Sequence, residues 1–414
     1  MSGTAGPAGA GPARRRLGLG ARILIGMIVG AAAGALIGKP ITRIEPIGEM
    51  FIRLLVLAAV PLVFFNLLAG LTALTDMRTF GRLAFRIVVY YTLTTVLALV
   101  LGLVAMSLIQ PGRGVQLTGA VDQAVGAVPS LGGVIMDLIP TNVVQAFADG
   151  KVAQIVVVSV LLGITTLLLP AQPRDRLRAG YALVAELFRR LVDVILFVAP
   201  VGIGALMAVT VGRYGAELFG PLARFLLGVW AAQLAMVGVY MTLLRTLTDR
   251  APLRFLRETA TLWATTASTT SSLASLSVAL EQAERIGLPR SVYAFTLPLG
   301  AQINKDGTSI MLTAVLLFTA QAAGVDFTIA QMLTILVIGL ILSEGSAGIP
   351  GGGLVIALIF VQAFSLPLEI AAIIGGIYRL VDMGNTTINV MGDMVGTAIV
   401  AHAEARRGAI PTTS

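Results

Sequence analysis

The chain has 414 residues, of which 57% are hydrophobic and 12% are charged, and its mean hydropathy is +0.91. This composition excludes an ordinary soluble domain and predicts an integral membrane protein. Cysteine is absent, which excludes disulfides and thiolate metal sites, and the single histidine, His402, argues against a histidine-based metal site or proton relay.

The net charge of +8 comes from arginines that gather beside the apolar segments. This is the positive-inside pattern, which places the arginine-rich loops and both chain ends in the cytoplasm. We therefore assign the charge to membrane topology and expect no nucleic-acid partner. The groups are Arg14–Arg16, Arg78/Arg82/Arg86, Arg174/Arg176/Arg178, Arg250/Arg254/Arg257, Arg285/Arg290 and Arg406/Arg407.

The first part of the chain predicts uninterrupted membrane spans. Residues 1–16 are rich in Gly, Ala and Pro and predict a disordered N-terminus. The following apolar run, Leu17 to Ile37, is longer than that of a signal peptide, so we expect an uncleaved first span. The predicted spans are 18–38, 45–74, 79–110, 152–171, 178–212 and 216–248.

Beyond residue 250 the apolar segments are interrupted by polar or glycine-rich sequence. Irregular backbone at membrane depth must be buried in protein or line a cavity, and paired broken segments point to a transporter site. Helix N-termini at such breaks can bind an anionic carboxylate. The segments are 253–286 with a Ser/Thr-rich centre at 265–275, 290–324 broken at 304–308, 328–366 broken at 343–353, and the last span, 369–404.

Polar residues form a stripe on the last predicted span. Their spacing of i, i+3, i+4, i+7 and i+11 places them on one helix face. Each charge costs about 3 kcal/mol inside a membrane, which favours a water-lined path or a ligand site, with polar helix packing as the alternative. The stripe is Asp382, Asn385, Thr386, Asn389 and Asp393.

The break at 304–308 has the residues of a cation site. Gly307 permits an unwound backbone, whose carbonyl groups could bind a hard cation together with Asp306. A structural kink is the alternative. The glycines at 345–353 follow no predicted strand and precede no P-loop lysine, which argues against a nucleotide site. Neither a G-x-S-x-G elbow nor a suitable histidine supports a hydrolase, so we expect no enzyme.

The order of these motifs resembles that of the dicarboxylate/amino acid:cation symporters, the glutamate transporter homologues. The resemblance covers residues 18–404 and includes the tyrosine and hydroxyl pattern at 90–95. It implies an all-α homotrimer of eight transmembrane helices and two re-entrant helical hairpins, working as an elevator. The implied divisions are a cytoplasmic N-terminus (1–16), scaffold spans 1 and 2 (17–78), span 3 of the transport domain (79–112), scaffold spans 4 and 5 (113–213), the remaining transport domain (214–404) and a cytoplasmic tail (405–414).

The resemblance also implies the residues that hold the substrate. Asp382 would receive the amino group, Thr386 and Asn389 the α-carboxylate, and Thr308 and Asn385 would face the side chain. The first hairpin would add Ser271, Ser272 and backbone N–H groups, and the second would add Gly348.

Three cation sites follow from the same resemblance, with Na⁺ or H⁺ as the coupling ion and no other cofactor. The first combines Asp393 with the carbonyls of Gly300, Asn304 and Asn389. The second combines Tyr91, Thr94, Thr95, Asn304 and Asp306. The third lies at the second hairpin tip, Ser343 to Ser346, near Gln302.

The sequence departs from the family where the substrate side chain is expected. Acidic-substrate members carry arginine at Asn385 or at Thr270, and this chain carries it at neither position. We therefore expect a small neutral amino acid, with an acidic amino acid or dicarboxylate, or an uncoupled facilitator or channel, as alternatives. Tyr378 also replaces a residue that is often acidic.

Lys305 and Glu344 stand where the family has apolar residues. One hypothesis is that the Lys305 ammonium replaces a sodium ion and pairs with Glu344 or Asp306, so that sodium coupling is reduced or replaced by protons. The alternative is that Lys305 points into an aqueous vestibule. In either case we expect a multi-pass protein of the inner (plasma) membrane, in contact with lipid, that takes a small-molecule substrate.

Overall fold

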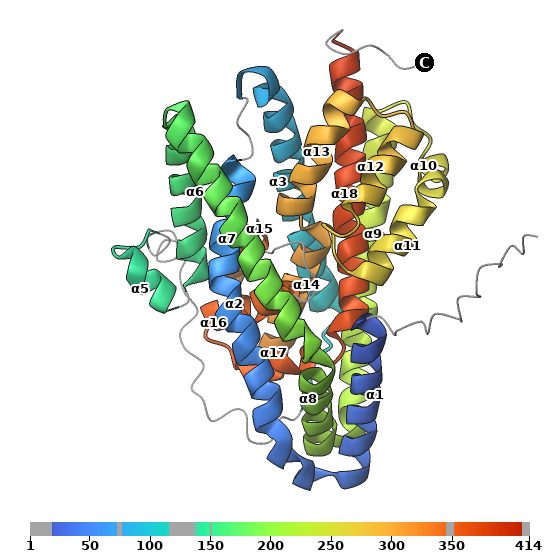
Figure 1. Ribbon diagram of the computed structural model, residues 1–414. Helices are drawn as coiled ribbons and strands as arrows, with labels where there is room; N and C mark the ends of the chain where they lie inside the picture. Colours follow the sequence, from blue (N-terminus) through green and yellow to red (C-terminus); the bar gives the residue numbers. More distant parts are fainter. Residues whose placement is uncertain are drawn as a thin grey trace, which may run out of the picture.

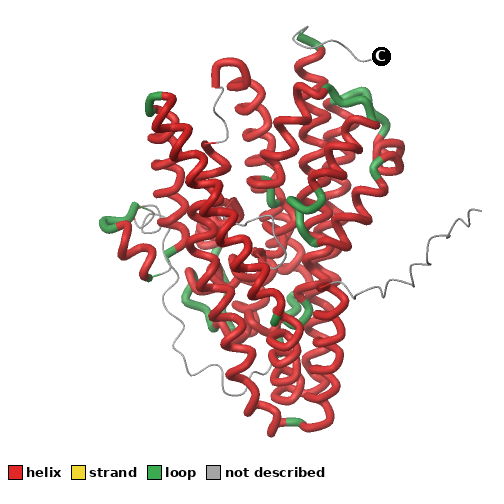
Figure 2. The backbone as a smooth tube through the Cα atoms, in the orientation of Figure 1, coloured by secondary structure: helices red, strands yellow, loops and turns green. Residues whose placement is uncertain are grey.

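The computed structural model describes residues 19–72, 77–115, 136, 139–149, 151–344 and 352–407. Every regular element in these ranges is a helix (Figures 1 and 2). The elements are α1 Leu19–Ile37, η1 Lys39–Ile44, α2 Glu45–Thr72, α3 Met77–Ile109, α5 Val143–Ala148, α6 Val152–Leu168, α7 Ala171–Phe197, α8 Ala199–Tyr214, η2 Gly215–Leu218, α9 Phe219–Leu247, α10 Pro252–Glu258, α11 Ala260–Thr269, α12 Leu276–Arg285, α13 Arg290–Ile303, α14 Asp306–Ala322, α15 Ile329–Glu344, α16 Gly352–Ala363, α17 Leu368–Gly375 and α18 Tyr378–Ala405.

Two helices within the described ranges are long and apolar enough to cross a membrane as single elements, Gly81–Ile109 and Phe219–Leu247. The bent pair α7 and α8, with 55° between them, gives a third. Shorter apolar helical stretches of the described residues are Ala21–Ile37, Val60–Thr72, Gln154–Leu168, Ile329–Ser343 and Gly352–Ala363. The all-helical structure agrees with the predicted class, while the number of eight spans stays a prediction.

Two predicted spans are each broken into two helices. The span predicted at 178–212 is interrupted at Val198, because Pro200 near the start of α8 has no N–H to continue the hydrogen bonds of α7. The span predicted at 369–404 is α17 followed by α18. The pair Gly375-Gly376 lies between them, and glycine is a poor helix former. A Cβ at Gly376 would also lie 2.3 Å from Met207 Cε of α8.

The N-terminal helices pack as one group, with α2 against α6, α7 and α8, and α1 along α8. The seam between α1 and α8 is built on Gly26, Gly30 and Gly34, spaced four residues apart. A Cβ at Gly30 would lie 2.1 Å from the carbonyl oxygen of Gly204, so that only glycine permits this approach of the two backbones.

Most of the other helices pack around α14. This helix is buried from Asp306 to Ala320 and contacts α3, α9, α15, α16, α17 and α18. Figure 1 shows α18 (red) running past α9, α12 and α13, which it contacts together with α11. The division into a scaffold and a transport domain, and a sliding movement between them, stay predictions.

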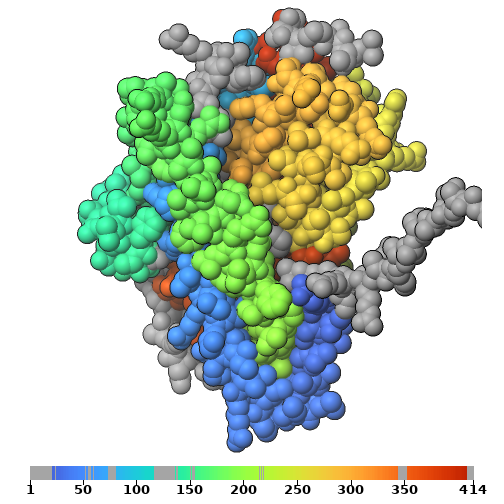
Figure 3. Space-filling view, viewed as in Figure 1, coloured from blue at the N-terminus to red at the C-terminus, as the bar shows by residue number. Residues whose placement is uncertain are grey.

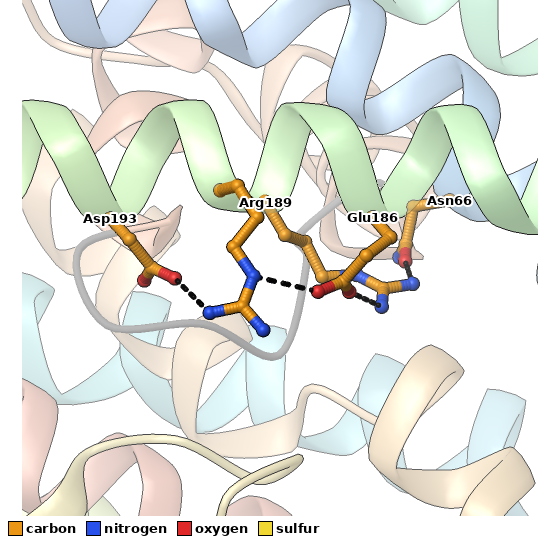
Figure 4. Close-up of polar contacts among 5 residues, drawn as sticks. Asn66, Glu186, Arg189 and Asp193 are labelled. Atoms are coloured by element: carbon orange, nitrogen blue, oxygen red, sulfur yellow. Dashed lines mark hydrogen bonds and ion pairs between the residues drawn. The ribbon is translucent and has the colours of Figure 1, made fainter.

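Polar contacts join α7 to α2 (Figure 4). Arg189 donates to Glu186 at 3.0 Å and to the buried Asn66 of α2 at 3.5 Å. Arg190 donates to the same glutamate at 3.0 Å and forms an ion pair with Asp193 at 3.9 Å. Figure 3 shows α7 (green) running across the visible face of the molecule, and this chain of contacts fixes it to α2.

Candidate substrate and cation sites

The predicted polar stripe lies on one helix and faces the protein interior. All five residues belong to α18, which is continuous from Tyr378 to Ala405. None of their side chains is more than 6% exposed. The carboxylates of Asp382 and Asp393 are thus kept away from lipid, as their charge requires.

Asn389 binds the N-terminus of α14, which begins at the predicted break. Its Oδ1 accepts from the N–H groups of Gly307 at 2.7 Å and Thr308 at 3.4 Å, and its Nδ2 donates to Thr308 Oγ1 at 3.3 Å. A Cβ at Gly307 would lie 2.4 Å from the carbonyl oxygen of Asn385. Glycine therefore lets α14 start directly against α18, where a substrate carboxylate could compete for the same N–H groups.

Asp306 is fully buried among hydroxyl groups from separate helices. Thr95 of α3 donates to its Oδ1 at 2.9 Å, and Tyr240 of α9 donates to its Oδ2 at 2.5 Å. Thr94 donates to the carbonyl of Tyr91 at 3.1 Å one turn away. The predicted second cation site is therefore brought together, with Tyr240 in addition.

Tyr240 is not singled out by the motif-based sequence analysis. It lies seven residues after Gln233, and both are polar side chains on the otherwise apolar buried face of α9. Residues seven apart lie on one helix face, so this pair carries a sequence signal of the same kind as the stripe on α18. Only the fold, however, shows that the face contacts α14 and α18.

The predicted first cation site is also assembled. Asn304 Nδ2 donates to Asp393 Oδ1 and to the carbonyl of Asn389, each at 2.9 Å. A Cβ at Gly300 would lie 2.3 Å from Asp393 Oδ1 and 2.4 Å from the hydroxyl of Tyr91. The two predicted cation sites are thus neighbours that share Asn304, and they combine carboxylate, hydroxyl and carbonyl oxygens, which suit a hard cation.

The third predicted cation site falls partly outside the described residues. Ser346 and Gly348 belong to 345–351, and the side chain of Glu344 is likewise not described. Ser343 is buried and donates to the carbonyl of Leu340 at 3.0 Å. Gln302 Oε1 is buried and has no hydrogen-bond partner among the described residues.

Asn385 is held by two neighbouring side chains. Its Oδ1 accepts from Gln233 Nε2 at 3.0 Å, and its Nδ2 lies 3.2 Å from the sulfur of Met311. The residue predicted to face the substrate side chain is therefore held by two uncharged side chains.

Asp382 lies beside the start of α16. Tyr378, one turn earlier, donates its hydroxyl to Asp382 Oδ1 at 2.8 Å. A Cβ at Gly353 would lie 2.8 Å from that hydroxyl and 3.3 Å from the Cγ2 of Thr308. The second arm of the second hairpin therefore packs directly on residues predicted to bind substrate.

The tip of the first hairpin is held by an arginine from α18. Arg379 donates to Thr270 Oγ1 and to the carbonyl of Ser268, the latter at 2.9 Å. Thr270 has a left-handed backbone (φ 50°), which is strained for a β-branched residue. The neighbouring Ser271 and Ser272 are buried. The sequence carries no arginine at position 270, but the guanidinium of Arg379 reaches this hairpin from another helix.

Lys305 is buried with 1% exposure, so its placement in an aqueous vestibule is wrong. Its ammonium donates to the carbonyl oxygens of Ala301 at 2.9 Å and Asn304 at 3.1 Å. It also interacts electrostatically with Asp393 and Asp306. The predicted pairing with Glu344 involves a side chain outside the described part and stays a prediction.

A family model described as the Sodium:dicarboxylate symporter family matches residues 19–403. The chain belongs to this family. It is therefore a membrane transport protein and not an enzyme, as the motif order indicates. It is 30% identical to the proton/glutamate-aspartate symporter of Escherichia coli, over 92% of each chain. It is 31% identical to a C4-dicarboxylate transport protein of Xanthomonas campestris (92% of this chain, 87% of the relative), and 28% identical to the proton/sodium-glutamate symport protein of Geobacillus stearothermophilus (94% and 95%).

Proposed function

We propose that this protein is a secondary active symporter that imports a small neutral amino acid together with a cation. The observation that carries the proposal is Asn385, an uncharged side chain held by Gln233 and Met311 where a substrate side chain is expected. Asp382, one turn away on the same face, supplies the negative charge that an ammonium group needs.

The arrangement of the other groups suits a zwitterion. Thr386 and Asn389 follow Asp382 on the stripe, and Asn389 already contacts the N–H groups at the start of α14. A substrate α-carboxylate could bind at this positive helix end, with Ser271, Ser272 and the first hairpin opposite. The ammonium group would then lie toward Asp382.

An acidic amino acid or dicarboxylate is the second candidate substrate. The names of the relatives favour it, and Arg379 brings a guanidinium to the first hairpin. Two observations weigh against it. Arg379 is already engaged by Thr270 and Ser268, and the carboxylate of Asp382 would repel a substrate with no ammonium group.

The coupling ion, Na⁺ or H⁺, would bind within the two neighbouring predicted cation sites around Asp306 and Asp393. The family description and the relative named for protons and sodium support this choice. We further propose a homotrimer in the inner membrane with both ends in the cytoplasm. Its transport domain would slide against the scaffold, which the packing of the helices in two groups supports.

The test is uptake by purified protein in liposomes. Labelled L-serine should accumulate against its gradient when a cation gradient is imposed, and unlabelled alanine should compete better than aspartate or succinate. Aspartate or succinate competing better than serine would refute the neutral substrate in favour of the second candidate. Uptake that only equilibrates would refute coupling and indicate a facilitator. Asn385→Arg should shift selectivity toward aspartate, because it supplies a bidentate partner for a second carboxylate.

A further inference from the structure

We propose that the ammonium group of Lys305 is a built-in cation that takes the place of one coupling ion at the Asp393 site. The inference rests on the proposed symport, and deepens it by naming the residue that sets how many ions accompany the substrate. The ammonium binds the carbonyl of Asn304, which is one of the oxygens predicted to hold an ion there.

The oxygens that receive the ammonium are available because a helix ends there. α13 stops at Ile303, and α14 starts only at Asp306. The carbonyls of the last turn of a helix lack intrahelical partners and form the negative end of its dipole. Lys305 folds back one turn and donates to two of these carbonyls, those of Ala301 and Asn304.

The surroundings have the features of an ion site in a membrane protein. The ammonium is withdrawn from water, and it acts on the carboxylate of Asp393, which shares Asn304 with it through the side-chain amide. A sodium ion in the predicted site would need one of the same oxygens, the carbonyl of Asn304, and would neutralise the same carboxylate. Because the lysine is tethered, it does this in every state of the transport cycle and cannot be released with the substrate.

A purely structural role is the competing explanation, in which Lys305 only caps α13. The two explanations differ in what sodium does when the charge is removed. If the ammonium replaces an ion, Lys305→Met or Lys305→Gln opens a site that sodium fills. If it is only a cap, sodium gains nothing from the substitution.

The experiment compares wild type with Lys305→Met and Lys305→Gln. The chain has two other lysines, Lys39 and Lys151, both exposed, so that Lys39→Met and Lys151→Met are matched controls. The first readout uses sodium alone and measures the melting temperature in sodium chloride against choline chloride. The second measures the Kd of L-serine and L-aspartate over a series of sodium concentrations.

We expect sodium to raise the melting temperature of both Lys305 variants more than that of wild type. The plot of log Kd against log sodium concentration should be steeper by about one ion, so that a tenfold rise in sodium tightens binding about ten times more than in wild type. Both control variants should match wild type.

The proposal is overturned if wild type and the Lys305 variants respond equally to sodium, or if the control variants change as much. It is also overturned if neither Lys305 variant folds in saturating sodium, because the ion should then have replaced the ammonium. Failure of serine and aspartate to bind, with the sodium response intact, would refute the proposed function and leave this inference standing.

Discussion

Substitution of Gly300 by alanine is the most direct perturbation of the proposed cation sites. The new methyl group would lie 2.3 Å from Asp393 Oδ1 and 2.4 Å from the hydroxyl of Tyr91. These two residues belong to different predicted cation sites. One methyl group in α13 therefore displaces ligands of both sites, without changing the charge of either.

The size of the effect follows from the distances. Ordinary van der Waals contact of a Cβ begins at 3.4 Å, so Asp393 Oδ1 must retreat by about 1 Å. Such a movement lengthens its 2.9 Å hydrogen bond from Asn304 beyond useful range. Overpacking typically costs about 1–3 kcal/mol, which corresponds to a loss of cation affinity of about 5- to 150-fold.

The assay is the cation concentration that gives half-maximal substrate binding to purified protein, for the cation that drives uptake by wild type. Gly300→Ala should raise it and leave the protein folded, as judged by size-exclusion chromatography. Gly238→Ala is the matched control, because a Cβ at that position of α9 would meet nothing within 4 Å. Asp393→Asn tests the same site by removing the charge at constant size.

An unchanged cation requirement in Gly300→Ala, together with a normal response of Gly238→Ala, would refute the assignment of Asp393 and Tyr91 to cation binding. A Gly300→Ala variant with a lower melting temperature but an unchanged cation requirement would refute the assignment as well. The close approach at Gly300 would then serve only the packing of α13 against α18.

Three further predictions concern other contacts. Gly30→Ala should destabilise the seam of α1 and α8 by about 1–3 kcal/mol, since its Cβ would lie 2.1 Å from a backbone oxygen; an unaltered melting temperature relative to the Gly180→Ala control would contradict this. Arg379→Gln should free the first hairpin, so that hydrogen exchange at 268–272 becomes faster and substrate binding weakens by about tenfold or more. Arg379→Lys should not restore substrate binding, because an ammonium group cannot replace the forked guanidinium. Tyr240→Phe removes the 2.5 Å hydrogen bond to Asp306 and should lower the free energy of unfolding by about 1.5–3 kcal/mol in cation-free buffer. The cation that drives uptake should recover part of this loss. Equal melting temperatures of variant and wild type would show that the hydrogen bond contributes nothing to stability.

The sequence predicts those parts of the site where a single residue or segment is energetically unfavourable in a membrane whatever its neighbours are. A charge or a helix break at membrane depth is expensive wherever it occurs, so Asp306, Asp382 and Asp393 could be picked out without a structure. The stripe on α18 is found as predicted, and the break predicted at 304–308 is found but is shorter, covering 304–305, because Asp306, Gly307 and Thr308 already form the first turn of α14. The interruptions at Val198 and Gly376 are not predicted, because apolar residues on both sides hide a proline and a glycine pair within long hydrophobic runs.

Contacts between distant segments are what the sequence could not supply. Arg379 is separated by 109 positions from Thr270, and Tyr240 by 66 positions from Asp306. An arginine or tyrosine in a membrane helix signals a polar neighbour but does not name it. The same applies to Lys305, whose ammonium could face water, a carboxylate or a carbonyl. In the structure it binds two carbonyl oxygens at the end of α13.

The way in which each buried carboxylate is neutralised separates the roles of the two cation sites. Asp306 also feels the Lys305 ammonium, but less strongly than it is stabilised by its hydroxyl donors from α3 and α9, which carry no charge, so a mobile cation can still bind there favourably. Asp393 has an amide donor and also lies in the field of the Lys305 ammonium, which already balances its charge. A second positive ion at Asp393 would be repelled by that ammonium, and we infer that the ion that still moves with the substrate binds at Asp306.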